Sequence, residues 1–381
     1  MAFRKRNVAV GASAPGSPAI APQKQENLPG VRPSPLTSHS VTSTGSSSLD
    51  ALLGGHGGLA LGSSVLIGEN GTTDFAGAFL KYYAAEGLCQ GHTIHLVGMG
   101  DWWLRELPAV AAERSGSRRE KSPAEEERMK IAWRYERLGQ SGERALPIRQ
   151  TPSAAGPAKE ELPFCHTFDL AKRLTIPQNA KIDHIKISPG DAPFAPVLQS
   201  LERILKNSPP TSVHRLIVPT ILSPASYPPH ASKPENIIRF LHSLRSLLRQ
   251  HPTKLTAMLT LPLELYPRDT GLVRWAEILS DGVLELTPFP HSMDEASDLA
   301  SSGGARSNED QPQGMVKVHK VPIDTERGEG GAGAGNSTGQ DLAFTVSRRK
   351  FAIKPFSLPP MEGDREAQKE GGGPTKKDLE F

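Results

Sequence analysis

The sequence predicts an α/β protein with a mostly parallel β-sheet flanked by helices, and with an antiparallel strand pair near its C-terminal end. Apolar runs of strand length at 65–68 and 93–98 enclose a stretch of helix length at 75–87. Strands that alternate with helices in this way are typical of a parallel sheet. Two later runs, at 315–323 and 342–356, have no helical stretch between them, so we expect them to pair antiparallel.

Composition predicts a single ordered domain. The 381 residues include 36 glycines and 34 prolines, a share well above the roughly 12% that is usual. Many of them lie in stretches with few large apolar side chains, which cannot offset the entropy lost on ordering. We therefore expect a disordered basic arm at 1–36, one domain at 37–356 and a disordered tail at 357–381. Low-complexity insertions in that domain are predicted at about 104–121, 139–162, 297–312 and 326–340.

The first strand, helix and strand form one unit of the predicted sheet. The strand at 65–68 is bounded by glycine, and the helix that begins at Phe75 is predicted to end at Gly87, because glycine accepts the left-handed conformation of a helix end. The next strand, at 93–98, then runs parallel to the first.

A further helix is predicted at 124–138, inside the charged region that follows. Ser122 is a suitable N-cap residue, Pro123 suits the first helical position, and Glu125 is the acid of a capping box. Aromatic residues at helical spacing, such as Trp133, indicate that this helix packs against the core.

The alternation resumes in the second half of the chain. Helices are predicted near 195–206 and at 235–250, and strands at 215–222, 254–261 and 282–289.

Charge and cysteine content exclude several classes of protein. The net charge is +3, and the first 36 residues carry five basic residues against one acid, so the rest of the chain is close to neutral and gives no sign of nucleic-acid binding by itself. Cys89 and Cys165 lie far apart without CxxC spacing, which excludes a zinc motif and fits a reducing compartment. With no apolar run of 18 residues and no signal-peptide pattern, we expect a soluble protein.

The most informative stretch is 43–83. It resembles the opening of RecA-like ATPases, with a TG turn, a short helix, a GG turn, and then strand, glycine loop and helix. A working loop has the pattern G-x-x-x-x-G-K-[ST], in which the lysine reaches the phosphates and the hydroxyl holds magnesium. Counting from Gly68, these positions hold Thr73, Asp74 and Phe75 instead. The candidate nucleotide site is therefore a degenerate loop, made of Gly68, Glu69, Asn70, Gly71, Thr72 and Thr73.

No other catalytic set is predicted. An acid that ends a buried strand would be needed to hold magnesium, but Pro219 and Thr220 follow the apolar run at 215–218, and Glu285 is a weak substitute. His92 and His166 lie near apolar runs, for which a structural role is the more frequent one. We expect neither catalytic residues nor metal ligands in this chain.

Four stretches together carry a resemblance to a known family. The chain resembles the PAXNEB family of Elongator subunits over about 37–356. The stretches are GENGTTDFAGAFLKYYAAEG at 68–87, MGDWWLRELP at 99–108, MKIAWRYERL at 129–138 and RLIVPTILSPASYPP at 215–229.

The resemblance implies an accessory RecA-like subunit and not an enzyme. Members assemble with the fifth and sixth Elongator subunits into a ring of six, two copies of each, which serves the catalytic Elongator subunits. Such rings bind tRNA and assist the addition of carboxymethyl-type groups to wobble uridines, and the complex is also associated with transcription elongation and histone acetylation. The resemblance further implies a cytoplasmic and nuclear location, no cofactor bound by this subunit alone, and ATP, where it binds, at ring interfaces.

Two alternatives stay open at this point. An active P-loop ATPase is disfavoured by the missing lysine, and a purely structural scaffold without RNA contact is not excluded by the sequence. For RNA contact, the candidate residues are Arg348, Arg349 and Lys350. The alternative for these three residues is protection of an exposed strand edge, a common use of charged side chains.

Overall fold

The described part of the chain covers most of the predicted domain. The computed structural model describes residues 28–35, 39–53, 57–111, 162–290, 312–322 and 341–356. The predicted helix at 124–138 and most of the predicted tails and insertions lie outside the described residues.

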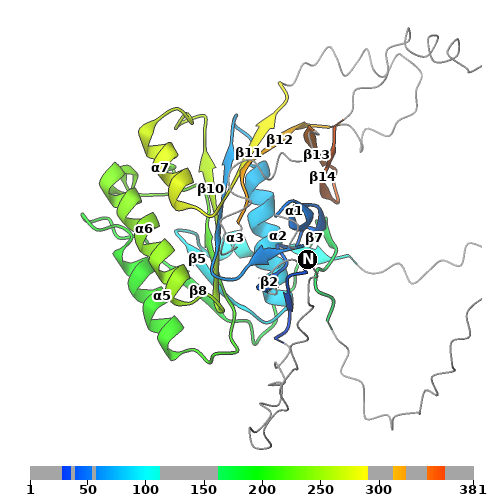
Figure 1. The fold of residues 1–381 in the computed structure, drawn as a ribbon, viewed down its shortest axis with the longest axis horizontal. Helices are drawn as coiled ribbons and strands as arrows, with labels where there is room; N and C mark the ends of the chain where they lie inside the picture. Colours follow the sequence, from blue (N-terminus) through cyan, green and yellow to red (C-terminus); the bar gives the residue numbers. More distant parts are fainter. Residues whose placement is uncertain are drawn as a thin grey trace, which may run out of the picture.

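One large sheet forms the centre of the molecule (Figure 1). Six neighbouring strands run parallel, and three antiparallel strands extend the sheet at one edge. The prediction of a mostly parallel sheet is confirmed. In spatial order the strands are β14 (Phe351–Pro355), β13 (Leu342–Val346), β12 (Gly314–Lys320), β11 (Gly282–Pro288), β4 (Ser64–Glu69), β10 (Leu255–Pro262), β9 (His214–Val218), β5 (Thr93–Val97) and β8 (Ile182–Ile185).

The strand order gives the fold its RecA-like character. Within the parallel part, β4 comes first in the chain, yet it lies between β11 and β10, the last two of these strands. The chain after β4 therefore crosses to the far side of β10 before it returns. In open α/β sheets, ligands bind at the carboxyl ends of strands where the order reverses in this way. The loop after β4 therefore lies at the position where a ligand site is expected in such a sheet.

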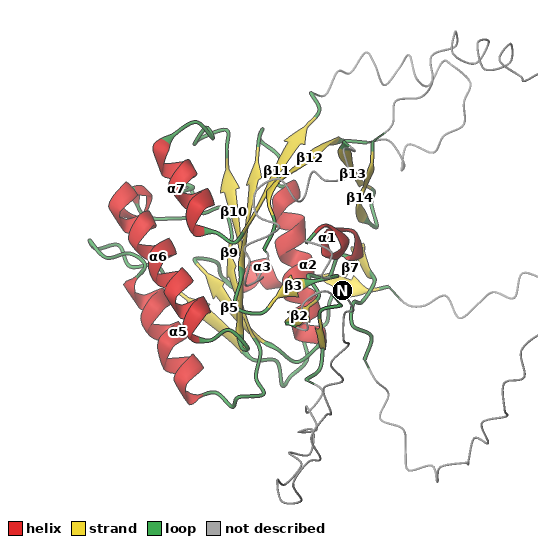
Figure 2. Cartoon of the chain, viewed as in Figure 1, coloured by secondary structure: helices red, strands yellow, loops and turns green. Residues whose placement is uncertain are grey.

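Helices cover both faces of the sheet (Figure 2). One face carries α1 (Ser47–Leu52), α2 (Phe75–Cys89) and α3 (Asp101–Leu104), and the other carries α5 (Ala195–Asn207), α6 (Pro234–Gln250) and α7 (Gly271–Leu279). Strand β4 shows why both layers are needed, because Val65 and Ile67 pack with the first layer while Leu66 packs with the second. None of the described helices has the length and apolar content needed to span a membrane.

Helix α2 is longer than predicted. It continues through Gly87 to Cys89, and the turn with positive φ is made by Gly91 at +74°. Gly87 serves packing instead, since a Cβ there would lie 2.7 Å from the side-chain Cδ of Arg215. Glycine inside the helix thus makes room for a buried arginine.

The predicted antiparallel pairing of the two C-terminal runs is confirmed, because β12 pairs antiparallel with β13, but the second run forms more than one strand. The run at 342–356 forms two strands, β13 and β14, because the polar residues at 347–350 turn the chain, with the Ser347 amide donating to the Lys350 carbonyl at 2.8 Å. The predicted pair is therefore a three-stranded antiparallel extension.

Two small sheets each include one strand from a stretch that the sequence predicts to be disordered or of low complexity. Strand β1 (Val31–Pro33) falls within the predicted arm at 1–36 and pairs with β2 (Ser40–Thr42), which in turn pairs with β3 (Leu59–Ala60). Strand β6 (Pro108–Val110) falls within the predicted insertion at 104–121 and pairs with β7 (Phe168–Arg173). Strands of three residues, such as β1 and β6, are too short to show a periodic pattern of apolar residues, so the sequence does not predict them. The ordered structure therefore extends beyond the predicted boundaries at both places.

Candidate functional site

The degenerate loop connects the carboxyl end of β4 to the first turn of α2. Strand β4 ends at Glu69 and α2 begins at Phe75. A helix start of this kind presents backbone N–H groups that have no partner within the helix, and it attracts anions. In a working nucleotide site, phosphate accepts these hydrogen bonds.

Here the carboxylate of Glu69 occupies this position. It accepts hydrogen bonds from the backbone amides of Phe75 at 3.0 Å and Ala76 at 2.7 Å, and from the Thr73 hydroxyl at 2.6 Å. The Glu69 side chain is buried, and this burial raises its pKa, an effect that the three hydrogen bonds oppose. The anion site at the start of α2 is therefore filled by the chain itself.

Asp74 stands at the position of the missing lysine. It is the N-cap residue of α2, and burial is the main cause that raises the pKa of its carboxyl, while the positive charge of Lys81 lowers it. Lys81 lies two turns into the helix and pairs with Glu106 at 2.6 Å. The loop thus has a carboxylate where a phosphate-binding site needs a cation.

Further carboxylates hold the tip of the loop. The Asn70 side-chain amide donates to Glu285 at 2.8 Å, and the Gly71 backbone amide donates to Glu264 at 3.2 Å. Glu285 also pairs with His319 at 2.7 Å, and this hydrogen bond is the largest cause that lowers the pKa of Glu285 to about 2. Glu285 is thus engaged in holding the loop rather than turned to an open metal position.

The end of β9 has no acid. The chain leaves the sheet after Val218, earlier than the predicted end at 222, and it turns through Thr220 and Leu222, which have positive φ values of 42° and 75°. The Thr220 amide donates to the Thr260 hydroxyl at 2.7 Å. Among the residues that the structure describes, no group of three or more His, Cys, Asp or Glu side chains could hold a metal ion.

Comparison with known proteins agrees with the resemblance seen in the sequence. The family model for PAXNEB protein matches residues 24–381. The chain belongs to the PAXNEB family. It is 35% identical to Elongator complex protein 4 of Schizosaccharomyces pombe, over 93% of this chain and 94% of that protein. Elongator complex protein 4 of Homo sapiens is 26% identical, over 88% of this chain and 80% of that protein. Among solved structures, a KaiC-like protein from Pyrococcus horikoshii aligns with a TM-score of 0.39 and 14% identity, over 83% of this chain and 99% of that chain.

The candidate RNA residues of this PAXNEB chain lie away from the loop. Arg348, Arg349 and Lys350 are exposed in the turn between β13 and β14, and β14 is an edge strand of the large sheet. The Arg349 carbonyl accepts a hydrogen bond from the Leu170 amide of β7 at 2.9 Å, which fixes the turn to the small sheet. The structure brings the three residues together but joins none of them to the loop through a contact of the described residues. The two interpretations of this cluster stay open.

A buried arginine on β9 is not predicted by the sequence. Arg215 is fully buried, and its guanidinium donates to His92 Nδ1 at 3.0 Å, the Tyr83 carbonyl at 3.0 Å and the Thr42 hydroxyl at 2.8 Å. Burial, and then the charge of Arg215, lower the pKa of His92 to about 3. An arginine next to an apolar run carries no pattern that predicts its burial.

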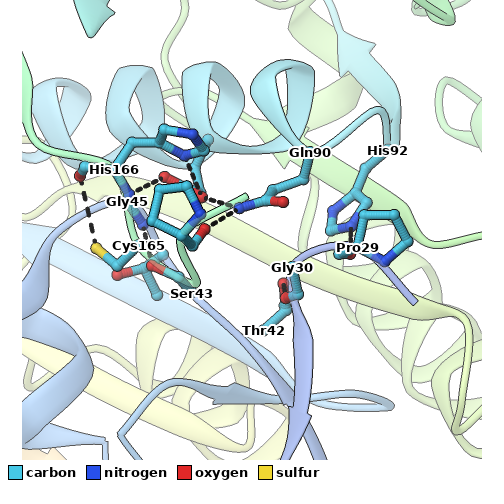
Figure 3. Close-up of polar contacts among 12 residues, drawn as sticks. Pro29, Gly30, Thr42, Ser43, Gly45, Gln90, His92, Cys165 and His166 are labelled. Carbon is cyan, nitrogen blue, oxygen red and sulfur yellow. Dashed lines mark hydrogen bonds and ion pairs between the residues drawn. The ribbon is translucent and has the colours of Figure 1, made fainter. Parts of the chain in front are cut away.

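Polar contacts also hold the N-terminal segment together and attach it to the turn that follows α2 (Figure 3). His92 Nε2 lies 2.9 Å from the Pro29 carbonyl oxygen, and the Thr42 hydroxyl donates to the Gly30 carbonyl at 2.8 Å. Next to them, His166 Nδ1 pairs with the buried Glu86 of α2 at 3.0 Å. His92 and His166 therefore have structural roles in this PAXNEB fold.

Proposed function

We propose that this chain is a non-catalytic subunit of the Elongator complex. The observation that carries the proposal is the Glu69 carboxylate on the amides of Phe75 and Ala76, because phosphate would need the same donors. Asp74 at the lysine position adds repulsion toward the terminal phosphates of ATP. A RecA-like domain whose loop is closed in this way acts through its surfaces rather than through hydrolysis.

The same proposal gives the chain its partners. The relatives are named Elongator complex protein 4, and this supports membership of that complex. We propose assembly with the fifth and sixth Elongator subunits into a ring of six, as the resemblance in the sequence implies. We further propose that the ring binds tRNA, supports wobble-uridine modification by the catalytic subunits, and binds ATP, where it does so, at interfaces between subunits. The proposed location is the cytoplasm and the nucleus, together with a link to transcription elongation.

Purification of the tagged chain from its own cells, followed by mass spectrometry, tests the assembly. We expect the other Elongator subunits in the eluate and a hexameric mass for the ring. A well-folded monomer without affinity for Elongator subunits would contradict the proposal.

Phosphate release by the isolated chain tests the catalytic claim. We expect no turnover of ATP above background. Turnover that disappears when Gly71 is replaced would favour the active ATPase, because the loop would then be competent. Cross-linking of bound tRNA within the ring separates an RNA-binding subunit from a scaffold, since a scaffold gives no cross-link to this chain.

A further inference from the structure

Helices α6 and α7 are neighbours on the outer face of the molecule (Figure 1). Their side chains line a groove. Its volume is about 430 Å³, and apolar atoms make up nearly all of its accessible wall. Trp275 lines this wall and is 52% exposed, and Ile278 on the same helix is 53% exposed. The lining residues are Pro234, Glu235, Ile238, Arg239, His242, Ser243, Trp275 and Leu279.

The groove is held in one shape by its own helices. The Arg245 guanidinium of α6 donates to the Ile278 carbonyl of α7 at 3.3 Å, and Arg268 pairs with Glu277 of α7 at 2.5 Å. The buried faces of both helices pack in the same core cluster. An exposed tryptophan on a rigid wall is the kind of residue that dominates the binding energy of protein interfaces. Because the wall is ordered beforehand, a partner that binds there loses little additional entropy.

Two arginines flank this apolar wall. Arg239 lines the groove, and Arg274 is exposed next to Trp275. Glu235 is the one carboxylate among the lining residues. The other described acids nearby are engaged, since Glu277 pairs with Arg268 and Asp281 pairs with Arg249 at 3.2 Å.

We propose that this groove binds an amphipathic helix of another protein subunit, one with an apolar face flanked by Asp and Glu. The apolar face fits the wall formed by Ile238, Trp275 and Leu279, and the acidic flanks fit the charge of Arg239 and Arg274. The low polarity of the wall disfavours nucleic acid, which needs donors for phosphates and base edges. This inference rests on the proposed function, because it requires that the chain work within a larger assembly.

A photo-cross-linking experiment in the intact assembly tests the groove. Benzoylphenylalanine replaces Ser243, the assembly is purified and irradiated, and the cross-linked peptides are sequenced. We expect a peptide from another subunit, with apolar residues at helical spacing and Asp or Glu beside them. A peptide from this chain or a second copy of it, an attached nucleotide, or no cross-link in an intact assembly would each overturn the proposal.

Two matched pairs of variants connect the cross-link to the groove chemistry. Trp275→Ala should lower its yield about tenfold, and so should Arg239→Glu combined with Arg274→Glu, since each removes one class of contact. Trp102→Ala removes a comparably exposed tryptophan, 57% exposed on α3, and Lys186→Glu reverses an exposed charge elsewhere; both should leave the yield unchanged. Equal losses in variants and controls would contradict the proposal.

The composition of the purified assembly tests the proposed function separately. Absence of Elongator subunits would contradict that function, whereas an intact Elongator assembly with an empty groove contradicts only this inference.

Discussion

Glu69 and Ala76 are joined by a hydrogen bond of 2.7 Å from the backbone amide of Ala76 to the carboxylate of Glu69. The two residues are seven positions apart, and the loop between them follows a strand and precedes a helix, as a phosphate-binding loop does in P-loop proteins. The Glu69 side chain at the end of β4 thus accepts the hydrogen bonds at the start of α2 that a bound anion would otherwise accept. The folded state of this loop does not depend on nucleotide.

Replacing Glu69 by alanine should destabilise the protein. Glu69→Ala leaves the amides of Phe75 and Ala76 without their acceptor, and an unpartnered buried amide costs about 1 to 3 kcal/mol. We expect the free energy of unfolding, measured with urea, to fall by about that amount. Glu264→Ala is the matched control, because Glu264 accepts only one exposed loop amide and should matter little.

Added inorganic phosphate distinguishes this cause from simple loss of packing. A vacated helix start attracts anions, so phosphate should raise the melting temperature of Glu69→Ala more than that of the parent chain. Equal responses would show that Glu69 does not stand in for an anion.

Stability should fall on the acid side of neutrality because of His214. Burial is the main cause that lowers the pKa of His214 to about 3, from 6.5. The unfolded chain therefore binds more protons than the folded chain between these values, so this contribution is complete above pH 6.5 and is lost as the pH falls toward 3. Urea unfolding at pH 7.5 and pH 5 measures the fall in the free energy of unfolding. We expect a smaller fall for His214→Gln than for the parent chain.

The hydrogen bonds of His214 support this direction. His214 Nδ1 lies 3.0 Å from His95 Nε2, and His95 Nδ1 lies 3.1 Å from the Asp183 carboxylate. His214 Nε2 lies 3.0 Å from the Ser212 hydroxyl, so both ring nitrogens of His214 have a partner within the fold. Burial disfavours the charged form of this ring, and the positive charge of Lys254 lowers the pKa of His214 further. Unfolding that is equally easy at both pH values would contradict this arrangement.

Arg215→Met should be among the most damaging single substitutions. It removes three hydrogen bonds at once and leaves His92 and Thr42 with buried polar atoms that lose a partner. The expected loss in the free energy of unfolding is about 3 kcal/mol or more. Arg203→Met on the exposed side of α5 is the control and should stay within about 0.5 kcal/mol of the parent. A similar small effect for Arg215→Met would show that the network contributes little.

The parallel sheet and the order of its elements were predictable because periodicity and glycine boundaries reflect burial on two faces. The residue types of the loop after β4, such as Asp74, could be compared with a working loop from the sequence alone, and the loss of nucleotide binding stays a prediction. The role of Glu69 was not predictable, because one carboxylate in a loop has many partners within reach until the turn is built. Arg215 and Gly87 show the same limit. The sequence predicts a helix end at Gly87. In the structure, glycine is needed at this position because the buried Arg215 of β9 approaches the helix closely there.

The basic turn at 348–350 provides the last prediction. If the three side chains contact phosphates of tRNA in the assembled ring, their replacement by serine should make the slope of log affinity against log salt shallower by about 0.7 for each lost contact. Titration of tRNA with the purified ring at two salt concentrations measures it. The matched control replaces Lys181, Lys186 and Arg203 by serine, because these exposed residues lie on or beside β8, at the opposite edge of the sheet from β14. An unchanged slope in an intact ring would remove the turn from the RNA surface and favour its role in protecting the edge strand.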